Sequence, residues 1–203
     1  LMNYLAHLHL AEDSDDALVG NLLGDFVKGR PERLDYPDAI RRGILLHRRV
    51  DSFTDRHPVF RTSRARLGAP YRRFAGIIID LAYDHFLARD WADYHDEPLP
   101  SFAARTYRAL ARHHHRLPPR LQRMAPVMSE QDWLSAYREL DNIERSLAGI
   151  ARRLSRPTPL PWAGEQLRLH YAGLEADFNA FMPDLEAFAR AERRRLRADL
   201  LAK

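Results

Sequence analysis

The chain has 203 residues, with 32 Lys plus Arg against 28 Asp plus Glu, a formal net charge of +4, ten His and no Cys. This length fits one domain or at most two small ones, and the lack of cysteine excludes disulfide scaffolds, thiolate metal sites and cysteine nucleophiles. The sequence has neither an apolar run long enough to cross a membrane nor a secretory signal pattern, so we expect a cytoplasmic protein.

Apolar residues recur at helical spacing along almost the whole chain, and no segment alternates like a β-hairpin. The pattern predicts an all-α fold. After an apolar opening at 3–10, helices are expected from about 17 to 28, from 37 to 57, from about 70 past 91, and at about 101–115, 130–154 and 163–198. We expect the last of these to break or kink at Pro183.

Ionisable residues stand inside strongly apolar stretches in the first half of the chain: Asp25, His47, Asp80, Asp84 and His85. Burying an isolated carboxylate is costly unless it is paired or bound to a cation. Asp80 and Asp84 are four residues apart and share a helix face, where a divalent cation would relieve their repulsion. Imidazole and carboxylate without thiolate suit manganese, iron, zinc or magnesium, and several carboxylates favour manganese or magnesium. Such a site activates water and neutralises charge on a phosphoryl group.

Each of these residues also has a purely structural interpretation. His47, Asp51 and Asp55 share a helix face, but the two aspartates can instead pair with Arg48 on an exposed surface. His47 alone can be a hydrogen-bonded core histidine, and Asp80 with Asp84 can form structural ion pairs. The His7-x-His9 spacing fits a pair of metal ligands or ordinary amphipathic alternation.

Five segments of the chain carry a shared pattern: Asn3–Leu10, Gly20–Gly29, His47–Asp55, Asp80–Leu87 with Trp91, and Ser129–Leu134 with Tyr137 and Arg138. Together they resemble one known family, the acyl-carrier-protein phosphodiesterases, also called holo-acyl-carrier-protein hydrolases. The resemblance implies a manganese-dependent enzyme that cleaves the phosphodiester between a carrier serine and 4′-phosphopantetheine, giving apo-carrier and free 4′-phosphopantetheine. It also implies an all-helical fold related to the HD-domain phosphohydrolases. We expect a single domain over 1–203, and a loosely attached tail after about residue 190, where the match to the family is weakest.

The resemblance and the residue chemistry together suggest a set of site residues. The Asp84-His85 order departs from the usual HD motif, in which His precedes Asp. We expect Arg48 or Arg49 to bind the phosphate and Asp51 to orient that arginine or an imidazole. The expected metal ligands are Asp25, His47, Asp84 and His85, with Asp80 as a ligand or its support and His7 as a further ligand or a residue that positions water.

Arginines cluster just before the Asp80 segment, and the resemblance implies an acidic acyl carrier protein as the partner. A basic rim there would steer such a partner toward the site, although the same arginines can simply be solvated. The expected partner-binding residues are Arg61, Arg64, Arg66, Arg72 and Arg73; the run Arg193–Arg195 is expected to be a solvated helix end.

Two other functions are compatible with the sequence. An HD-like phosphohydrolase can act on a nucleotide or alarmone instead of a carrier. A non-enzymatic, arginine-rich helical adaptor can bind nucleic acid, although the modest net charge of +4 and the lack of aromatic residues among the arginines disfavour it. We therefore expect neither a nucleic-acid nor a membrane partner.

Overall fold

The computed structural model describes residues 4–201, and within this range the chain is helical with no strand, which confirms the predicted all-α fold. No described helix is both long and apolar enough to cross a lipid bilayer. The α-helices are α1 (Tyr4–His9), α2 (Asp15–Leu23), α3 (Asp38–Arg56), α4 (Pro58–Arg66), α5 (Ala75–Arg89), α6 (Leu99–Arg112), α7 (Pro119–Glu130), α8 (Trp133–Ala136), α9 (Leu140–Ala151), α10 (Ala163–Leu169) and α11 (Tyr171–Leu201). Short 3₁₀ helices separate some of them: η1 (Pro31–Arg33), η2 (Ala69–Phe74), η3 (Trp91–Asp93), η4 (His114–Arg116) and η5 (Leu160–Trp162).

Several helix boundaries follow local chemistry. The Ser14 hydroxyl accepts a hydrogen bond from the Ala17 amide at 3.2 Å and caps α2. Pro58 ends α3 at Arg56 and begins α4, because the residue before a proline avoids helical geometry and proline suits a first helical position.

Three of the predicted helices are divided in the structure. The helix expected over 130–154 separates into the end of α7, α8 and α9, because Asp132 adopts a left-handed backbone with φ 43° that a helix cannot continue through. Residues 69–74 form η2 rather than the first turns of α5. The last break falls at His170, and α11 continues through Pro183, which is exposed, so the carbonyl left without a donor can face water.

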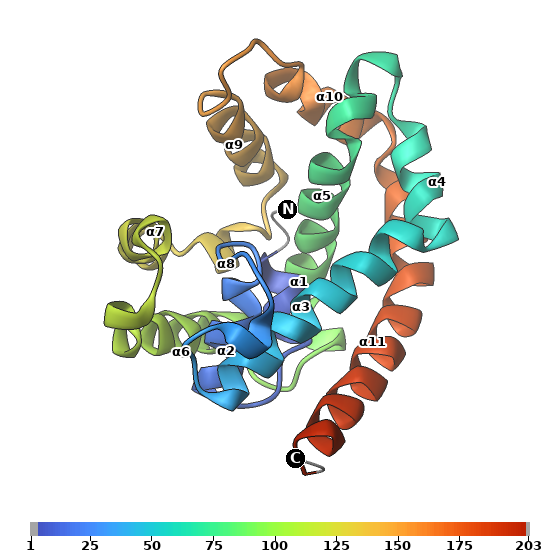
Figure 1. Ribbon diagram of the computed structural model, residues 1–203. Helices are drawn as coiled ribbons and strands as arrows, with labels where there is room; N and C mark the ends of the chain where they lie inside the picture. Colours follow the sequence, from blue (N-terminus) through green and yellow to red (C-terminus); the bar gives the residue numbers. More distant parts are fainter. Residues whose placement is uncertain (1–3, 202–203) are drawn as a thin grey trace.

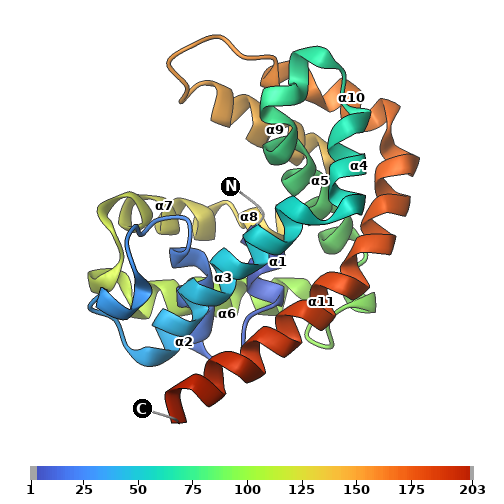
Figure 2. The same ribbon diagram turned by 45° about the vertical axis from the view of Figure 1, so that its right-hand side comes forward.

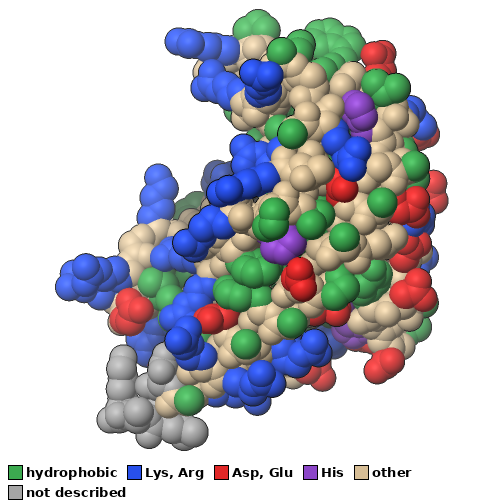
Figure 3. Space-filling view, turned by 90° about the vertical axis from the view of Figure 1, so that its right-hand side faces the viewer, with side chains coloured by type: hydrophobic (Ala, Val, Ile, Leu, Met, Phe, Trp, Pro, Cys, Tyr) green, Lys and Arg blue, Asp and Glu red, His purple; other side chains and the backbone are tan. Residues whose placement is uncertain are grey.

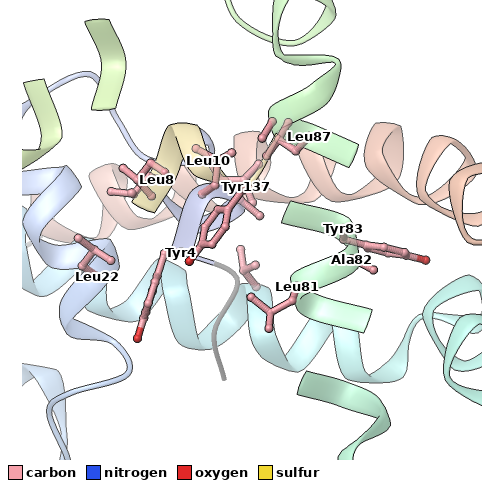
Figure 4. Packing of buried hydrophobic residues seen from close by; sticks show 14 of the residues in the cluster. Tyr4, Leu8, Leu10, Leu22, Leu81, Ala82, Tyr83, Leu87 and Tyr137 are labelled. Atoms are coloured by element: carbon pink, nitrogen blue, oxygen red, sulfur yellow. The ribbon is translucent and has the colours of Figure 1, made fainter. Parts of the chain in front are cut away.

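Helix α5 is the buried centre of the molecule. Residues 78–88 are buried on every side, as expected for a helix that is apolar all round. Helix α5 contacts α1, α4, α9 and α11, and Figures 1 and 2 show these helices on different sides of it. Figure 4 shows side chains of α5 packed with those of α1 and with Tyr137, which follows α8. Ionisable residues of α5 are therefore held among apolar neighbours.

Helices α2 and α3 cross at very close range because glycines meet at the crossing. A Cβ added at Gly20 would lie 2.4 Å from the Ile40 carbonyl oxygen, and one added at Gly43 would lie 2.8 Å from the Gly20 backbone. Only residues without a side chain allow this approach. The crossing brings the C-terminal end of α2 against the middle of α3, where the candidate site lies.

The C-terminal helix is attached along its length rather than loose. Arg193 donates to the Leu10 carbonyl at 2.6 Å, and Arg197 donates to the Glu12 carboxylate at 2.7 Å. Leu196 is buried, so the segment after residue 190 packs on the fold through Arg197, while residues 202 and 203 lie outside the described range. Arg194 and Arg195 are exposed, whereas Arg193 is partly buried.

Candidate metal centre

Two histidines and one aspartate form a tight cluster where α1 meets α3. His7, His47 and Asp51 each offer one ligand atom, and these atoms lie within 4.8 Å of one another. The two imidazoles stack with centroids 3.7 Å apart, and each Asp51 oxygen faces one of them, at 3.1 Å from His7 Nε2 and 3.3 Å from His47 Nε2. Both histidines are 1% exposed. The cluster is thus an inward-facing group of nitrogen and oxygen donors.

The end of α2 sets the orientation of His47. The Asn21 carbonyl oxygen lies 2.7 Å from His47 Nδ1; because a carbonyl only accepts, Nδ1 carries the proton and Nε2 faces the carboxylates. A Cβ added at Gly24 would lie 2.2 Å from His47 Cγ, so glycine is needed there for the ring to occupy its place. The tautomer suits a metal-binding Nε2.

Two further carboxylates border the cluster. Asp25, at the end of α2, places an oxygen 3.4 Å from His47 Nε2. Asp80 of α5 is 3% exposed, and its Oδ2 has no hydrogen-bond partner among the described residues. Burial, and then the nearby charge of Asp51, raise the pKa of Asp80 well above its usual range. Asp80 therefore holds an oxygen that the protein itself does not use.

The charges within the cluster are strongly coupled. Burial alone would lower the pKa of His47, but hydrogen bonds with Asp25 and Asp51 outweigh it and raise that pKa to about 9. Burial and the neighbouring His47 charge lower the pKa of His7. Burial would raise the pKa of Asp51, yet its bonds to His47 and His7 hold it well below the usual range. Without a metal, His47 is thus the protonated member of the stacked pair.

The donor set fits a divalent cation. Buried polar atoms normally have partners, yet His7 Nδ1 and Asp80 Oδ2 have none among the described residues. The proton that His47 shares with two carboxylates is the positive charge that a cation would replace. Two imidazoles with carboxylates, and no thiolate, match the ligands of manganese, iron, zinc or magnesium.

Two residues predicted as ligands are placed elsewhere. Asp84 accepts hydrogen bonds from the Leu5 and Ala6 amides, both at 2.9 Å, and so caps α1. His85 lies about 100° further around α5, where Nδ1 is 2.9 Å from the Tyr137 carbonyl oxygen and Nε2 is 2.8 Å from the Tyr171 hydroxyl. Both imidazole nitrogens are occupied away from the cluster. Neither residue belongs to the group of His7, His47 and Asp51, and the contacts of Asp84 hold α1, the helix that carries His7.

The predicted phosphate-binding arginines and the neighbouring polar residues also have other contacts. Arg48 donates to the Val27 and Gly29 carbonyls at 2.8 and 2.6 Å, which secures the loop after α2. Arg49 pairs with Glu192 of α11. His9 and Asp55, which the sequence spacing placed near the predicted ligands, also pair away from the cluster, His9 with Glu186 and Asp55 with Arg64.

The arginines predicted to bind a partner lie on α4 and η2 but do not form one free surface. Arg66 donates to both oxygens of the buried Asp177, at 2.7 and 2.9 Å, and is a structural residue. Arg64 lies 4.0 Å from Asp55. Arg61, Arg72 and Arg73 are exposed and make no ion pair with a described acidic residue.

Sequence reasoning missed the glycines and the backbone carbonyl that build the centre. Gly20 and Gly43 let the helices meet, Gly24 makes room for His47, and Asn21 contributes its carbonyl rather than its side chain. The four-residue spacing of Gly20 and Gly24 was the available signal, since glycine inside a helix is unfavourable unless close packing requires it.

An all-helical fold that brings two buried histidines and an aspartate together is compatible with a metal-binding enzyme. A sequence profile of the family described as acyl carrier protein phosphodiesterase matches residues 2–185. The chain belongs to the acyl carrier protein phosphodiesterase family.

Individual relatives agree with this assignment. An acyl carrier protein phosphodiesterase of Enterobacter sp. (strain 638) is 40% identical over 183 residues, covering 90% of this chain and 94% of the relative. Proteins of the same description from Serratia proteamaculans and Klebsiella pneumoniae are 41% and 39% identical, covering 91% and 93% of this chain and 95% and 97% of the relatives. No solved structure is matched by the chain.

Proposed function

We propose that this protein is a phosphodiester hydrolase that removes 4′-phosphopantetheine from holo-acyl carrier protein. Family membership over residues 2–185 gives the reaction. The observation that supports a site for it is the buried group of His7, His47 and Asp51, the one cluster of at least three potential ligands found among the described residues. The products are apo-carrier and free 4′-phosphopantetheine.

We propose that His7, His47 and Asp51, with Asp25 and Asp80 beside them, hold a divalent cation, with manganese as the first candidate. When bound, such an ion lowers the pKa of water and neutralises charge on phosphoryl oxygens. The protein's own contribution is orientation. Asp51 aligns both imidazoles, and the Asn21 carbonyl keeps the His47 proton at Nδ1. Burial of both histidines shields the site from bulk water.

We propose that the exposed Arg61, Arg72 and Arg73 contribute to attraction of an acidic carrier, because none is committed to a described acidic residue. Arg66 is excluded from this group by its contacts with Asp177. Charge reversal at Arg72 should raise the KM for holo-carrier at low salt and leave hydrolysis of a small phosphodiester unchanged.

The proposal is tested by incubating the protein with holo-carrier and Mn²⁺ and measuring the carrier's mass. Loss of the phosphopantetheine mass is expected, and a panel of nucleotides should react more slowly. Faster hydrolysis of a nucleotide would favour the other phosphohydrolase function, and no hydrolysis of any phosphate ester would favour the adaptor. A cytoplasmic location and the HD-domain relationship stay predictions.

A further inference from the structure

A cavity of about 480 Å³ lies between α9 and residues of α1, α5, α7 and α8. We call it the α9 cavity. Its walls combine aromatic and aliphatic side chains with amide, hydroxyl and guanidinium groups, among them Tyr4, Leu81, Trp133, Asn142, Ser146 and Arg153. Volumes of this order accommodate a small molecule, whereas a protein surface must stay outside.

The α9 cavity and the metal centre share two helices. Tyr4 lines the cavity on α1, three residues before His7, and Leu81 lines it on α5, directly after Asp80. Figure 4 shows Tyr4, Leu81 and Tyr137 coming together from different elements. The cavity and the metal centre are therefore built on the same two helices, although neither His7 nor Asp80 itself lines the cavity.

The charges around Tyr4 also connect the α9 cavity with the metal centre. Its pKa is raised by burial and by the charge of Asp25, and is opposed by the charges of Arg120 and Arg153. The Tyr4 hydroxyl thus lies within electrostatic range of Asp25, a carboxylate beside the metal centre, and of Arg153, which follows α9.

The cavity is positively charged at its edge. Arg145 of α9 is exposed, as are Arg152 and Arg153 directly after it. None of the three forms an ion pair with a described acidic residue, whereas Arg168 of the adjacent α10 pairs with Asp141 and Glu144. Figure 3 shows Lys and Arg side chains along the hollowed edge of the molecule. An anionic group on a small molecule would be stabilised here.

We propose that the α9 cavity binds the 4′-phosphopantetheine arm of the substrate while the carrier stays outside. This inference rests on the proposed function. The arm is the part of holo-carrier small enough to enter. Its amide N–H groups match the side-chain oxygens of Asn142 and Ser146, whose own donors are bound to the Ala136 and Asn142 carbonyls. Its methyl-bearing carbon matches the apolar wall. Its phosphate, which carries the scissile bond, would lie at the end of the cavity lined by Tyr4 and Leu81, on the two helices that carry His7 and Asp80.

Gly149 allows a selective test, because it lines the cavity on α9. A Cβ there meets only the ends of Arg152 and Arg153, at 3.6 and 3.9 Å, and leucine forms helix better than glycine. Gly149→Leu therefore keeps the helix while filling the cavity. The matched control is Gly76→Leu on α5, where a Cβ has no neighbour within 4 Å.

Two measurements decide the matter in the manganese-loaded protein: the affinity for free 4′-phosphopantetheine, by calorimetry, and kcat/KM on holo-carrier relative to bis(p-nitrophenyl) phosphate. We expect Gly149→Leu to weaken 4′-phosphopantetheine binding by at least about tenfold. The kcat/KM for holo-carrier, divided by the kcat/KM for bis(p-nitrophenyl) phosphate, should fall by a similar factor. Gly76→Leu should match the wild type in both.

Equal 4′-phosphopantetheine affinity in Gly149→Leu and Gly76→Leu would overturn the inference. So would a Gly149→Leu protein that loses affinity for apo-carrier instead, because the cavity edge would then dock the carrier itself. If the wild type hydrolyses the small diester but leaves holo-carrier intact, the proposed function fails and the inference fails with it. A wild type that hydrolyses holo-carrier, with a Gly149→Leu variant that does so equally well, overturns only the inference.

Discussion

At the scale of single residues, His47 is the side chain whose contacts bear most directly on metal binding. Its Nδ1 is bound to a backbone carbonyl, while its Nε2 faces Asp25 and Asp51. These two carboxylates raise the pKa of His47 to about 9 in spite of burial, so the metal-free protein holds a proton where a cation is proposed to bind. Metal and proton then compete for one nitrogen.

Metal binding should therefore release protons. His47 must lose its Nε2 proton to become a ligand, so near pH 7 at least one proton should leave per bound Mn²⁺. The affinity should rise about tenfold per pH unit toward pH 9. Calorimetric titrations in two buffers of different ionisation enthalpy measure the proton count. An affinity that does not change from pH 6 to pH 8, with no proton release, would contradict this.

The raised pKa of His47 also makes the stability of the metal-free protein depend on pH. The folded-state pKa of His47 lies above its ordinary value of 6.5, so the stabilisation from its ion pairs is complete below about pH 6.5 and is lost as pH rises through 9. The free energy of unfolding of the metal-free protein should fall over that window in urea titrations. A metal-free His47→Gln variant should lack most of this dependence, and an unchanged slope would argue against the assigned proton.

At the scale of helices, α1 depends on a residue distant in sequence. α1 is a six-residue helix, too short to be stable alone, and the Asp84 carboxylate of α5 binds two of its first amides. Since α1 carries His7, we propose that Asp84 positions this proposed ligand and does not bind the metal itself.

Substitutions at Asp84 separate these roles. Asp84→Ala leaves two buried amides without a partner and should lower the free energy of unfolding by about 2–4 kcal/mol. Asp84→Asn retains one acceptor oxygen and should cost less, with metal binding largely kept. Urea unfolding and metal analysis measure both effects. Complete loss of metal in a fully stable Asp84→Asn protein would instead make Asp84 a ligand.

The crossing of α2 and α3 makes a second prediction at this scale. Gly43→Ala would place a Cβ 2.8 Å from the Gly20 backbone, so it should cost about 1–3 kcal/mol and weaken metal binding by moving Asp25 away from His47. Gly76→Ala, which meets no neighbour within 4 Å, should be neutral or slightly stabilising. Unfolding curves of the two alanine variants give the comparison, and equal stability would show that the crossing is not tight.

For the whole molecule, local sequence patterns were enough to predict the helices, whereas contacts between distant residues determine which side chains lie in the candidate site. Helical spacing is a property of neighbouring residues, so the all-α class and most helices were predictable. His47, Asp25 and Asp80 were found because ionisable groups stood among apolar ones. Asp84 and His85 stood in the same environment, yet their partners at Leu5, Ala6 and Tyr137 lie 52–79 residues away in sequence. No local spacing reveals such partners.

The central claim is that the cluster around His47 is the centre of metal-dependent diester hydrolysis, and one matched pair of variants tests it most directly. Asp51→Asn removes a charge that faces both imidazoles; Asp55→Asn makes the same change one turn along α3, at a residue whose side chain is 57% exposed. Each metal-stripped protein is titrated with Mn²⁺ while the mass of holo-carrier is followed.

We expect wild type and Asp55→Asn to regain turnover with added Mn²⁺, while Asp51→Asn stays at least about a hundredfold slower at every concentration. Equal turnover in the two variants, or full activity of the metal-stripped wild type without added cation, would contradict the central claim.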